Sequence, residues 1–355
     1  MATNQTMWAL VKDQAAPGLW LQKRPIPKVD IKGVLIRVKK AGICGTDLHI
    51  HNWDHWAQNR IKPGIIVGHE FMGEVVAVGE AVTAVQVGDR VSAEGHIGCG
   101  FCYCCRTGQG HICDRVDIIG VDVDGCFAEY IHMPEANVWK LHPSIPDHWG
   151  AIHDPLGNAV HTVMAGGGVD GRTVLVMGLG SIGLMCVMLA KAAGAVEVFG
   201  VDVIPRKLEQ GLQMGADRVF DARHDNLEQE ILDLTNYRRG VDIVLEVSGN
   251  VQAFRRCLHL VRCGGQVRLL GIPPAEVSCD LATEVIFKGI TLYGINGRLM
   301  FETWYQMENF LTRHKLNLDP LITHQLPMTR FEEAFRLLES GEATKIVFDV
   351  EGISA

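Results

Sequence analysis

The sequence lacks the features that membrane and nucleic-acid-binding proteins need. No apolar run reaches the roughly 18 residues of a membrane-spanning helix. The formal net charge is −8 and the lysines and arginines form no basic run, whereas binding to a polyanion requires clustered positive charge. The first residues also lack the basic and apolar segments of a secretory signal. We therefore expect a cytoplasmic protein without a nucleic-acid or membrane partner.

Disulfide bonds are a further feature that we expect to be absent. The chain contains 11 cysteines, and in a cytoplasmic protein such thiols stay reduced or bind metal. The composition is otherwise that of an ordinary globular protein, with 47% hydrophobic and 21% charged residues. A chain of 355 residues is long enough for two domains that each bury a core.

The sequence does contain a set of metal-ligand side chains between residues 44 and 70. Cys44, His69 and Glu70 supply a thiol, an imidazole and a carboxylate from two segments. Three ligands of these types suit a zinc ion that keeps one position open for substrate. Thr46 and His49 lie beside the thiol in the sequence and can carry a proton. Each residue alone is more often structural, but their combination favours a metal site.

A second group of cysteines follows at residues 99–113. Its spacing, C-x2-C-x2-C-x7-C, lets four thiolates surround one zinc ion with no open position. Disulfide bonds are a weaker interpretation in a cytoplasmic chain, and spacing alone leaves an iron–sulfur cluster possible. We interpret Cys104 as a free thiol because it departs from the regular spacing. The predicted ligands are Cys99, Cys102, Cys105 and Cys113.

A dinucleotide-binding pattern begins in the middle of the chain. The β-branched run 173–177 leads into Gly178, Gly180 and Gly183, spaced G-x-G-x-x-G, and then into an apolar helix and a strand that ends at Asp202. The glycines permit a tight turn and close approach of a pyrophosphate. Asp202 can accept hydrogen bonds from the ribose of NAD and repel the 2′-phosphate of NADP. The neighbouring basic residues 206 and 207 weaken that preference without reversing it.

Hydrophobic patterns predict an α/β fold with two parts. Short alternating runs in the first 155 residues indicate antiparallel strands of a partly closed β-barrel, including a strand over 125–130. From residue 173 strands alternate with helices, which predicts a doubly wound parallel sheet. The last helices and strand break this alternation and should return to the first part. The predicted domains are 1–155 with 300–355, and 156–299.

One acidic residue near the start of a predicted helix, 151–162, has two compatible interpretations. Asp154 directly precedes Pro155, and an acid before a proline at a helix start can serve as the N-terminal cap. Asp154 can also approach the metal or an oxygen bound to it. Both roles remain open at this point.

Together these motifs resemble the zinc-dependent medium-chain alcohol dehydrogenases along nearly the whole chain. The resemblance rests on CGTD at 44–47, GHE at 68–70, the cysteine group and GLGSIG at 178–183. Further stretches resemble the L-threonine 3-dehydrogenases within that family. These are CGTDLHIHNWDHW at 44–56, EGHI at 94–97, DPLGNAVHT at 154–162, IFKG at 286–289 and FETWY at 301–305.

The resemblance implies a GroES-like barrel domain, a Rossmann domain, NAD, two zinc ions per chain, and a cytoplasmic homotetramer. It implies a catalytic zinc on Cys44, His69 and Glu70, a structural zinc on the four cysteines, a proton relay through Thr46 and His49, and an acid, Asp154, near the zinc. Lys207 and Asn296 depart from the arginine and tyrosine of close relatives. The implied NAD-contacting residues are Ile182, Asp202, Lys207, Leu270, Gly271, Ile272, Ile295 and Asn296.

The expected reaction is the NAD-dependent oxidation of L-threonine at its secondary hydroxyl, which gives 2-amino-3-oxobutanoate and NADH in threonine catabolism. A polyol or butane-2,3-diol substrate is the nearest alternative for the same side chains. A non-catalytic zinc-ribbon protein that senses nucleotides is an alternative of another class. Two metal ions per chain would favour the enzyme, because a zinc-ribbon protein needs only the cysteine group.

Overall fold

The computed structural model describes residues 5–353. Contacts between Cα atoms divide the chain into two compact units. Unit 1 comprises residues 1–155 and 322–355, and unit 2 comprises residues 156–321. No helix in the described part of the chain is both long and apolar enough to cross a membrane.

The second crossover between the units differs from the expected one. The predicted second domain ended at residue 299, whereas unit 2 continues to Leu321. The helix α10 (Glu302–Thr312) lies in this extension. The extension stays with unit 2 because its last turn, Asp319–Leu321, packs against α6 (Ser181–Ala192) of that unit.

Unit 1 is built on antiparallel sheets that carry one parallel pair. The main sheet has the strand order β10-β6-β5-β3-β18-β17, with β9 also paired to β3, and a smaller sheet has the order β2-β1-β4. Among the described strands of these two sheets, only β17 and β18 pair in parallel. The bounds of the strands in the two sheets are β1 Thr6–Lys12, β2 Trp20–Pro25, β3 Gly33–Gly42, β4 Ile65–Ile66, β5 Glu70–Val78, β6 Arg90–Ala93, β9 Tyr130–Pro134, β10 Val138–Lys140, β17 Ile322–Pro327 and β18 Lys345–Asp349.

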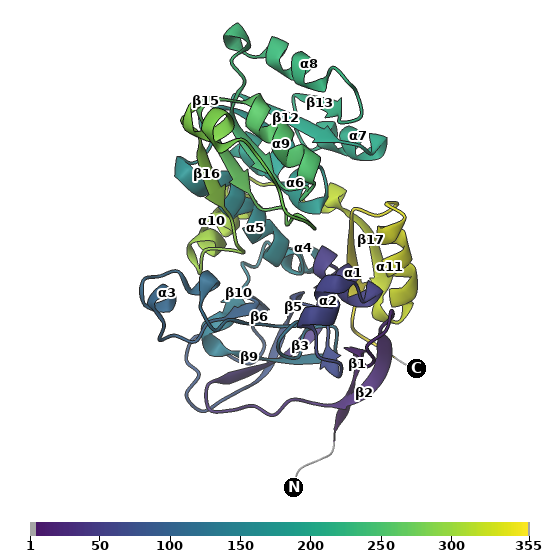
Figure 1. Cartoon of the computed structure of the whole chain (residues 1–355). Coiled ribbons are helices and arrows are strands. Elements are labelled where there is room, and N and C mark those ends of the chain that lie inside the picture. Colours follow the sequence, from purple (N-terminus) through teal and green to yellow (C-terminus); the bar gives the residue numbers. More distant parts are fainter. Residues whose placement is uncertain (1–4, 354–355) are drawn as a thin grey trace. The chain divides into compact units, whose positions relative to one another are not determined.

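The C-terminal segment completes unit 1. β18 pairs with the end of β3, with Phe348 opposite Ala41, and its side chains join the unit's hydrophobic core. Phe127 and Phe348 meet edge to face there, with ring centroids 5.5 Å apart. Figure 1 shows the yellow C-terminal elements, including α11 (Phe331–Glu339), beside the purple helix α1 (Gly45–Asn52). The expected return of the chain to the first domain is therefore seen from residue 322 onward.

The helices of unit 1 are short and lie mostly in its connections. Besides α1 and α11 they are α2 His55–Arg60, α3 Tyr103–Arg106 and α4 Asp147–Gly150, and a two-stranded ribbon of β7 His96–Ile97 and β8 Asp117–Ile118 flanks α3. The strand predicted over 125–130 is wrong for most of its length, because β9 begins only at Tyr130. Residues 125–127 instead donate backbone hydrogen bonds to the carbonyls of residues 66–68, at and just after the end of β4.

Unit 2 is a doubly wound parallel sheet, as predicted. Its strands have the order β13-β12-β11-β14-β15-β16, so the order reverses at β11, and the pairs within it are parallel. The helix α5 (His153–Met164) leads into this unit. The other bounds are β11 Thr173–Met177, β12 Glu197–Asp202, α7 Pro205–Gln213, β13 Arg218–Asp221, α8 Leu227–Leu234, β14 Val241–Glu246, α9 Val251–Leu260, β15 Val261–Leu269 and β16 Thr291–Gly294.

Candidate functional site: two metal-ligand clusters and a dinucleotide cavity

Cys44 stands where the chain turns from a strand into a helix. β3 ends at Gly42, and Cys44 is the extended residue that precedes α1, with φ −105° and ψ 163°. Its backbone N–H donates to Oδ2 of Asp47 at 2.8 Å. This bond satisfies a donor at the helix start and fixes the direction of the Cys44 thiol.

Two glycines make room for the second half of the site, at the start of β5. Gly68 has φ +92°, and a Cβ there would lie 2.3 Å from the ring of Phe127. A Cβ on Gly42 would lie 2.2 Å from Oε2 of Glu70. Any larger side chain at these positions would displace the aromatic ring or the carboxylate, so the glycines allow Glu70 to lie against β3.

The structure brings Cys44, His69 and Glu70 together. One donor atom from each of the three lies within 4.8 Å of the others. Glu70 is fully buried and His69 is 8% exposed. A thiol, an imidazole and a carboxylate at these separations match the ligand set of a zinc ion with an open position, so the residues fit the implied metal.

The carboxylate of Asp47 lies on the Nδ1 side of the His69 ring. Oδ1 of Asp47 lies 3.7 Å from Nδ1 of His69, and both atoms are buried without a hydrogen-bond partner among the described residues. This orientation leaves Nε2 of His69 for a metal. Burial lowers the pKa of the imidazole, but the charges of Asp47 and Cys44 outweigh it and raise the pKa of His69 to about 10. The pocket thus favours positive charge at this position.

Lys345 is a functional candidate that sequence reasoning missed. Its Nζ lies 2.7 Å from Oε1 and 2.5 Å from Oε2 of Glu70, and it also donates to the carbonyl of Ile43. Burial raises the pKa of Glu70, and the Lys345 ammonium opposes that rise. The two residues are 275 positions apart, so no local pattern could have joined them.

The other predicted residues of unit 1 lie around this cluster. The Cys44 thiol donates to Oγ1 of Thr46 at 3.9 Å, while His49 is exposed on α1 and bonds to Asp54. Asp154 is 7% exposed and its charge raises the pKa of Glu70. It is outside the group of donor atoms found among the described residues. The capping role expected for Asp154 is wrong, because α5 begins one residue earlier and Asp154 lies inside its first turn.

The four-cysteine lobe gathers its thiols through local turns. Donor atoms of the four predicted ligands lie within 4.8 Å of one another, and all 11 cysteines of the chain are free thiols. Backbone N–H groups donate to the sulfur atoms: Cys99 N to Cys113 Sγ at 3.3 Å, Cys105 N to Cys102 Sγ at 3.5 Å, and Arg115 N to Cys113 Sγ at 3.3 Å. Such donors stabilise thiolates, the form that binds zinc.

The pKa values differ within the lobe. Backbone N–H groups of Phe101 and Cys102 lower the pKa of Cys99 to about 6, whereas burial raises the pKa of Cys105 to about 12. Cys104 is not part of the group of donor atoms, which agrees with the prediction from its spacing. Burial raises the pKa of the Cys104 thiol as well.

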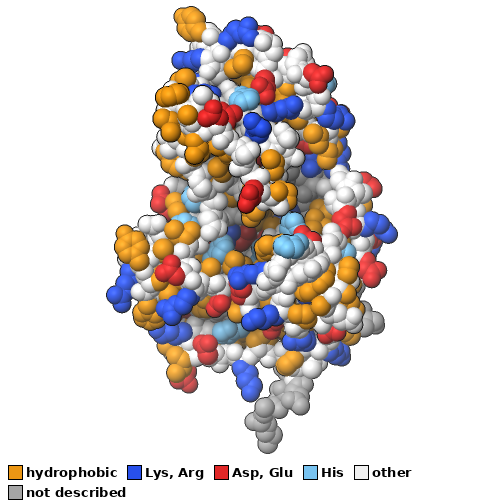
Figure 2. Space-filling model, viewed as in Figure 1, with side chains coloured by type: hydrophobic (Ala, Val, Ile, Leu, Met, Phe, Trp, Pro, Cys, Tyr) orange, Lys and Arg blue, Asp and Glu red, His pale blue; other side chains and the backbone are white. Residues whose placement is uncertain are grey.

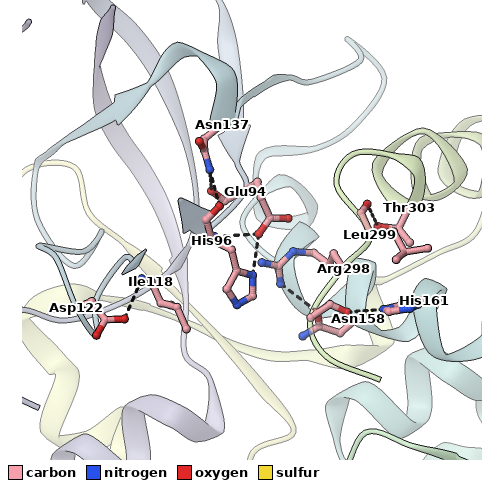
Figure 3. A network of polar contacts seen from close by, with 11 residues as sticks. Glu94, His96, Ile118, Asp122, Asn137, Asn158, His161, Arg298, Leu299 and Thr303 are labelled. Atoms are coloured by element: carbon pink, nitrogen blue, oxygen red, sulfur yellow. Dashed lines mark hydrogen bonds and ion pairs between the residues drawn. The ribbon is translucent and has the colours of Figure 1, made fainter. Parts of the chain in front are cut away.

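Residues 94–97, which carried part of the resemblance, are held by a buried carboxylate. Oε1 of Glu94 accepts from the backbone N–H of His96 at 3.0 Å and lies 3.1 Å from its Nδ1. Asn137 donates to the carbonyls of both residues (Figure 3). In unit 2, Arg298 donates to Oδ1 of Asn158 at 3.0 Å (Figure 3).

The glycine-rich turn of unit 2 has the geometry that a pyrophosphate requires. Gly178 has φ +96°, and a Cβ on Gly183 would lie 1.9 Å from the carbonyl oxygen of Gly178. At Gly180, by contrast, no described atom outside its immediate chain neighbours lies within 4 Å of a Cβ position. Gly180 precedes α6 without a side-chain cap, so the first N–H groups of this helix face an open approach. The turn fits a dinucleotide phosphate.

A cavity of about 340 Å³ lies beside this turn. Asp202 is on its wall, and its carboxylate accepts backbone N–H groups of Leu179 at 2.8 Å, Val203 at 2.8 Å and Ile204 at 2.9 Å. Asp202 therefore fixes the glycine-rich turn and retains acceptor capacity toward the cavity. The sequence did not identify the other wall residues. They lie at or just after strand ends (Met177, Val201, Val203, Ala222, Ser248 and Asn250) or in helix α9 (Gln252, Ala253 and Arg256).

The remaining predicted contacts lie at helix starts and strand ends of unit 2. Ile182 is in the first turn of α6 and Lys207 in that of α7, while 270–272 follow β15 and 295–296 follow β16. Gly271 must be glycine, since a Cβ would lie 2.1 Å from the backbone nitrogen of Gly249. The buried carboxylate of Glu246 accepts from that nitrogen at 3.1 Å and fixes the neighbouring loop. Neither loop contact was predictable from spacing.

The chain matches models of known families in both units. Residues 30–144 match the alcohol dehydrogenase GroES-like domain and residues 181–313 match the zinc-binding dehydrogenase domain. The L-threonine 3-dehydrogenase of Bacillus licheniformis is 47% identical over 96% of this chain and 98% of its own length. That of Pyrococcus abyssi is 45% identical over 97% and 99%.

Solved structures share the complete fold. Alcohol dehydrogenase TADH of Thermus sp. ATN1 superposes with a TM-score of 0.89 at 29% identity, over 97% of this chain and 99% of its own. Galactitol-1-phosphate dehydrogenase of Escherichia coli gives 0.88 at 27% identity, over 97% and 100%. An alcohol dehydrogenase of E. coli solved with NADH gives 0.89 at 26% identity, over 97% and 99%.

Proposed function

We propose, from the premise that this chain belongs to the zinc-binding alcohol dehydrogenase family, that it oxidises L-threonine with NAD at the secondary hydroxyl. The products are 2-amino-3-oxobutanoate and NADH. The observation that carries the proposal is the group of Cys44, His69 and Glu70 in a chain that is 47% identical, nearly end to end, to an L-threonine 3-dehydrogenase. The reaction supplies a step of threonine catabolism.

The chain's own side chains supply the sites for two bound groups. Cys44, His69 and Glu70 would hold the catalytic zinc, and the four lobe cysteines would hold a structural zinc. When bound, the catalytic zinc supplies a Lewis acid for the substrate hydroxyl and NAD supplies a hydride acceptor. Asp47 keeps Nδ1 of His69 away from the metal position, which fixes the ring orientation.

The proton of the substrate hydroxyl leaves through Thr46 and His49. Thr46 can both donate and accept through one hydroxyl, and its Oγ1 lies next to the Cys44 thiol. His49 is exposed on the same helix, so a proton that reaches its ring can pass to water. Asp154 is a charged partner for the substrate ammonium, because it is a carboxylate close enough to affect the Glu70 pKa.

NAD is favoured over NADP by the acid at the end of β12. Asp202 lines the cavity beside the glycine-rich turn and presents a negative charge where a 2′-phosphate would lie. Lys207, in the first turn of α7, and the residues after β15 and β16 complete the proposed set of NAD contacts. A lower KM for NADP than for NAD would contradict this assignment.

We propose a homotetramer in the cytoplasm, as the family resemblance of the sequence implies, and an exposed sheet edge in unit 2 supports association between chains. β16 is an edge strand with mostly exposed residues, and unpaired edges are places where chains associate. Exposed apolar side chains lie near it in sequence, among them Ile286 at 68% and Phe287 at 80%. Figure 2 shows hydrophobic side chains on this side of unit 2, around β15 and β16. Sedimentation equilibrium measures the assembly directly.

The decisive experiment is a dehydrogenase assay on the purified chain. NADH formation is measured with L-threonine, sorbitol and butane-2,3-diol at equal concentrations, with and without a chelator. We expect the highest kcat/KM with L-threonine and loss of activity on chelation. A higher kcat/KM with sorbitol or butane-2,3-diol would mean that this compound, and not L-threonine, is the substrate. A chain without dehydrogenase activity that holds one zinc would instead be a non-catalytic nucleotide-binding protein.

A further inference from the structure

The helix that carries His49 ends in a strained turn. After α1 ends at Asn52, Trp53 takes the left-handed conformation, with φ 53° and ψ 45°, which is strained for a bulky side chain. Two backbone bonds close the turn: Trp53 N–H donates to Ile50 O at 3.3 Å, and Asp54 N–H donates to His49 O at 3.4 Å. The turn therefore directs Asp54 back toward His49.

A buried lysine holds the turn in place. Nζ of Lys12 lies 4.8 Å from the centroid of a Trp53 ring. The same ammonium donates to the carbonyls of Ala16 at 2.5 Å, Gly18 at 2.9 Å and His51 at 3.5 Å. A strained tryptophan fixed by a fully buried cation indicates that the position of the next residue, Asp54, is specified by the fold.

Asp54 uses both carboxylate oxygens at this turn. Oδ1 accepts from the backbone N–H of Ala57 at 3.0 Å and caps α2. Oδ2 lies 2.5 Å from Nδ1 of His49. An ionised carboxylate only accepts hydrogen bonds, so Nδ1 carries the proton and Nε2 carries the lone pair of the neutral ring. The indole of Trp56 lies beside the imidazole, with centroids 6.0 Å apart.

We propose that Asp54 is a positioning residue that keeps His49 in the tautomer able to accept a proton at Nε2. The inference rests on the proposed proton path through His49. In that step an N–H bond forms at Nε2 as the O–H bond of the donor breaks, and the imidazolium charge lies beside the Asp54 carboxylate. The proton then leaves to water, which restores the neutral ring, and no electrons change hands.

Asp54→Asn is a selective test because the asparagine has only one acceptor oxygen. Asparagine is as good a helix cap as aspartate, so its oxygen stays on the Ala57 N–H and its NH2 group turns toward His49. Nδ1 must then accept, and the proton moves to Nε2. The variant thus preserves the start of α2 and reverses the tautomer, so that Nε2 can no longer take a proton.

The tautomer is measured without reference to activity. The zinc-loaded protein is labelled with 15N-histidine, and the His49 signals are assigned by their absence from His49→Gln. At a pH where the ring is neutral, we expect Nδ1 to be protonated in the unmodified protein and Nε2 in Asp54→Asn. An unprotonated Nδ1 in the unmodified protein would overturn the proposal while leaving threonine oxidation intact.

Kinetics of the single and double variants test whether Asp54 acts through His49. We expect Asp54→Asn to lower kcat about 10- to 100-fold, because a positioned base contributes about 10²- to 10⁴-fold, with less than about a threefold change in KM. In a His49→Gln background, Asp54→Asn should have no further effect. An equal loss of kcat in both backgrounds would overturn the positioning role.

Glu339→Gln is the matched control. Glu339 faces another histidine of α1, His51, with Oε1 3.7 Å from its Nδ1, so the variant removes the same charge from a second carboxylate–histidine pair. We expect unchanged kcat and an unchanged His49 tautomer. If His49→Gln itself keeps full activity, the proposed proton path is wrong, whereas the NMR result still decides the tautomer.

Discussion

The two groups of metal-ligand side chains in unit 1 have different kinds of charge around them. In the cluster of Cys44, His69 and Glu70, a buried lysine contacts the carboxylate and a buried aspartate faces the imidazole. In the four-cysteine lobe, backbone N–H groups donate to the sulfur atoms. Backbone dipoles lower the pKa of Cys99 in the partly exposed lobe, whereas the fully buried Glu70 carboxylate has a full opposite charge beside it.

The two clusters also differ in how far the chain travels to build them. All four lobe cysteines lie between residues 99 and 113, so turns of a few residues bring them together. The other cluster needs the end of β3, the start of β5 and, through Lys345, the start of β18. A local site tolerates rearrangement elsewhere, while a site built from distant strands depends on the complete sheet. Substitutions in each cluster separate the local site from the site that depends on the complete sheet.

The largest effect is expected when the mixed-ligand cluster loses its thiol. Cys44→Ser should lower kcat with L-threonine about 10⁴-fold, because the Lewis acid is lost or misplaced. The zinc content, measured by plasma emission, should fall from about two to about one per chain. The exposed thiol of Cys263 supplies the control, and Cys263→Ser should retain both values. Full activity and full zinc content in Cys44→Ser would remove the cluster from the mechanism.

Loss of the buried cation should destabilise the same cluster. Lys345→Met leaves the Glu70 carboxylate buried without its partner, which should lower the free energy of unfolding of the metal-free chain by about 4 kcal/mol. Denaturant melts followed by circular dichroism measure this change. Lys345→Arg keeps the charge and should cost less. Equal melts for Lys345→Met and the unmodified chain would show that Glu70 is not charged in the metal-free protein.

Loss of a lobe ligand should affect stability more than chemistry. Cys102→Ser should remove the second zinc ion and lower the free energy of unfolding by about 3 kcal/mol, a typical linkage energy for a bound ligand. The kcat of the remaining folded protein should stay within about tenfold. Cys104 lies next to the predicted ligand Cys105 but is outside the group of donor atoms. Cys104→Ser should therefore change neither the zinc content nor the free energy of unfolding. A catalytic collapse in Cys102→Ser at full folding would mean that the lobe acts on the chemistry.

The smallest effect is expected at a carboxylate of unit 2 that has an arginine and no metal ligand as its partner. Asp242 accepts from Arg262 at 2.6 Å and from the Thr173 backbone at 2.8 Å. Burial raises its pKa, but these bonds outweigh burial and hold the pKa below 3.8. Asp242→Asn should cost about 1 kcal/mol at neutral pH, allowing for partial solvent screening.

The pH dependence of that difference has a defined sign. A lowered pKa means that the stabilisation is complete above the unfolded value of about 3.9 and disappears as the pH falls through the lower folded value. Urea melts between pH 7 and pH 2 should therefore show that the free energies of unfolding of Asp242→Asn and the unmodified protein converge as the pH falls. The exposed pair of Asp233 and Arg238 provides the control. A difference in unfolding free energy between Asp242→Asn and the unmodified protein that stays constant at all pH values would contradict the assignment.

The parallel sheet was the part of the fold that local patterns described best. The strand at 173–177 was predicted with the bounds that the structure has, and the next predicted strand ends at Asp202 as expected. Buried parallel strands form apolar runs and their connecting helices are amphipathic, so each element has a local signal. α1 and α2 had no such signal, since their histidines, tryptophans and polar residues form no apolar stripe, and sequence analysis did not predict them.

The sequence by itself determined the residue groups for which we propose the chemistry: the four-cysteine spacing, the glycine-rich turn with Asp202, and the thiol, imidazole and carboxylate between residues 44 and 70. These are local arrangements, and their spacing already restricts what they can bind. Only the tertiary structure decided that Lys345 contacts Glu70 and that Asp54 faces His49. The first contact spans most of the chain through strand pairing, and the second depends on a left-handed residue that a buried lysine holds in place.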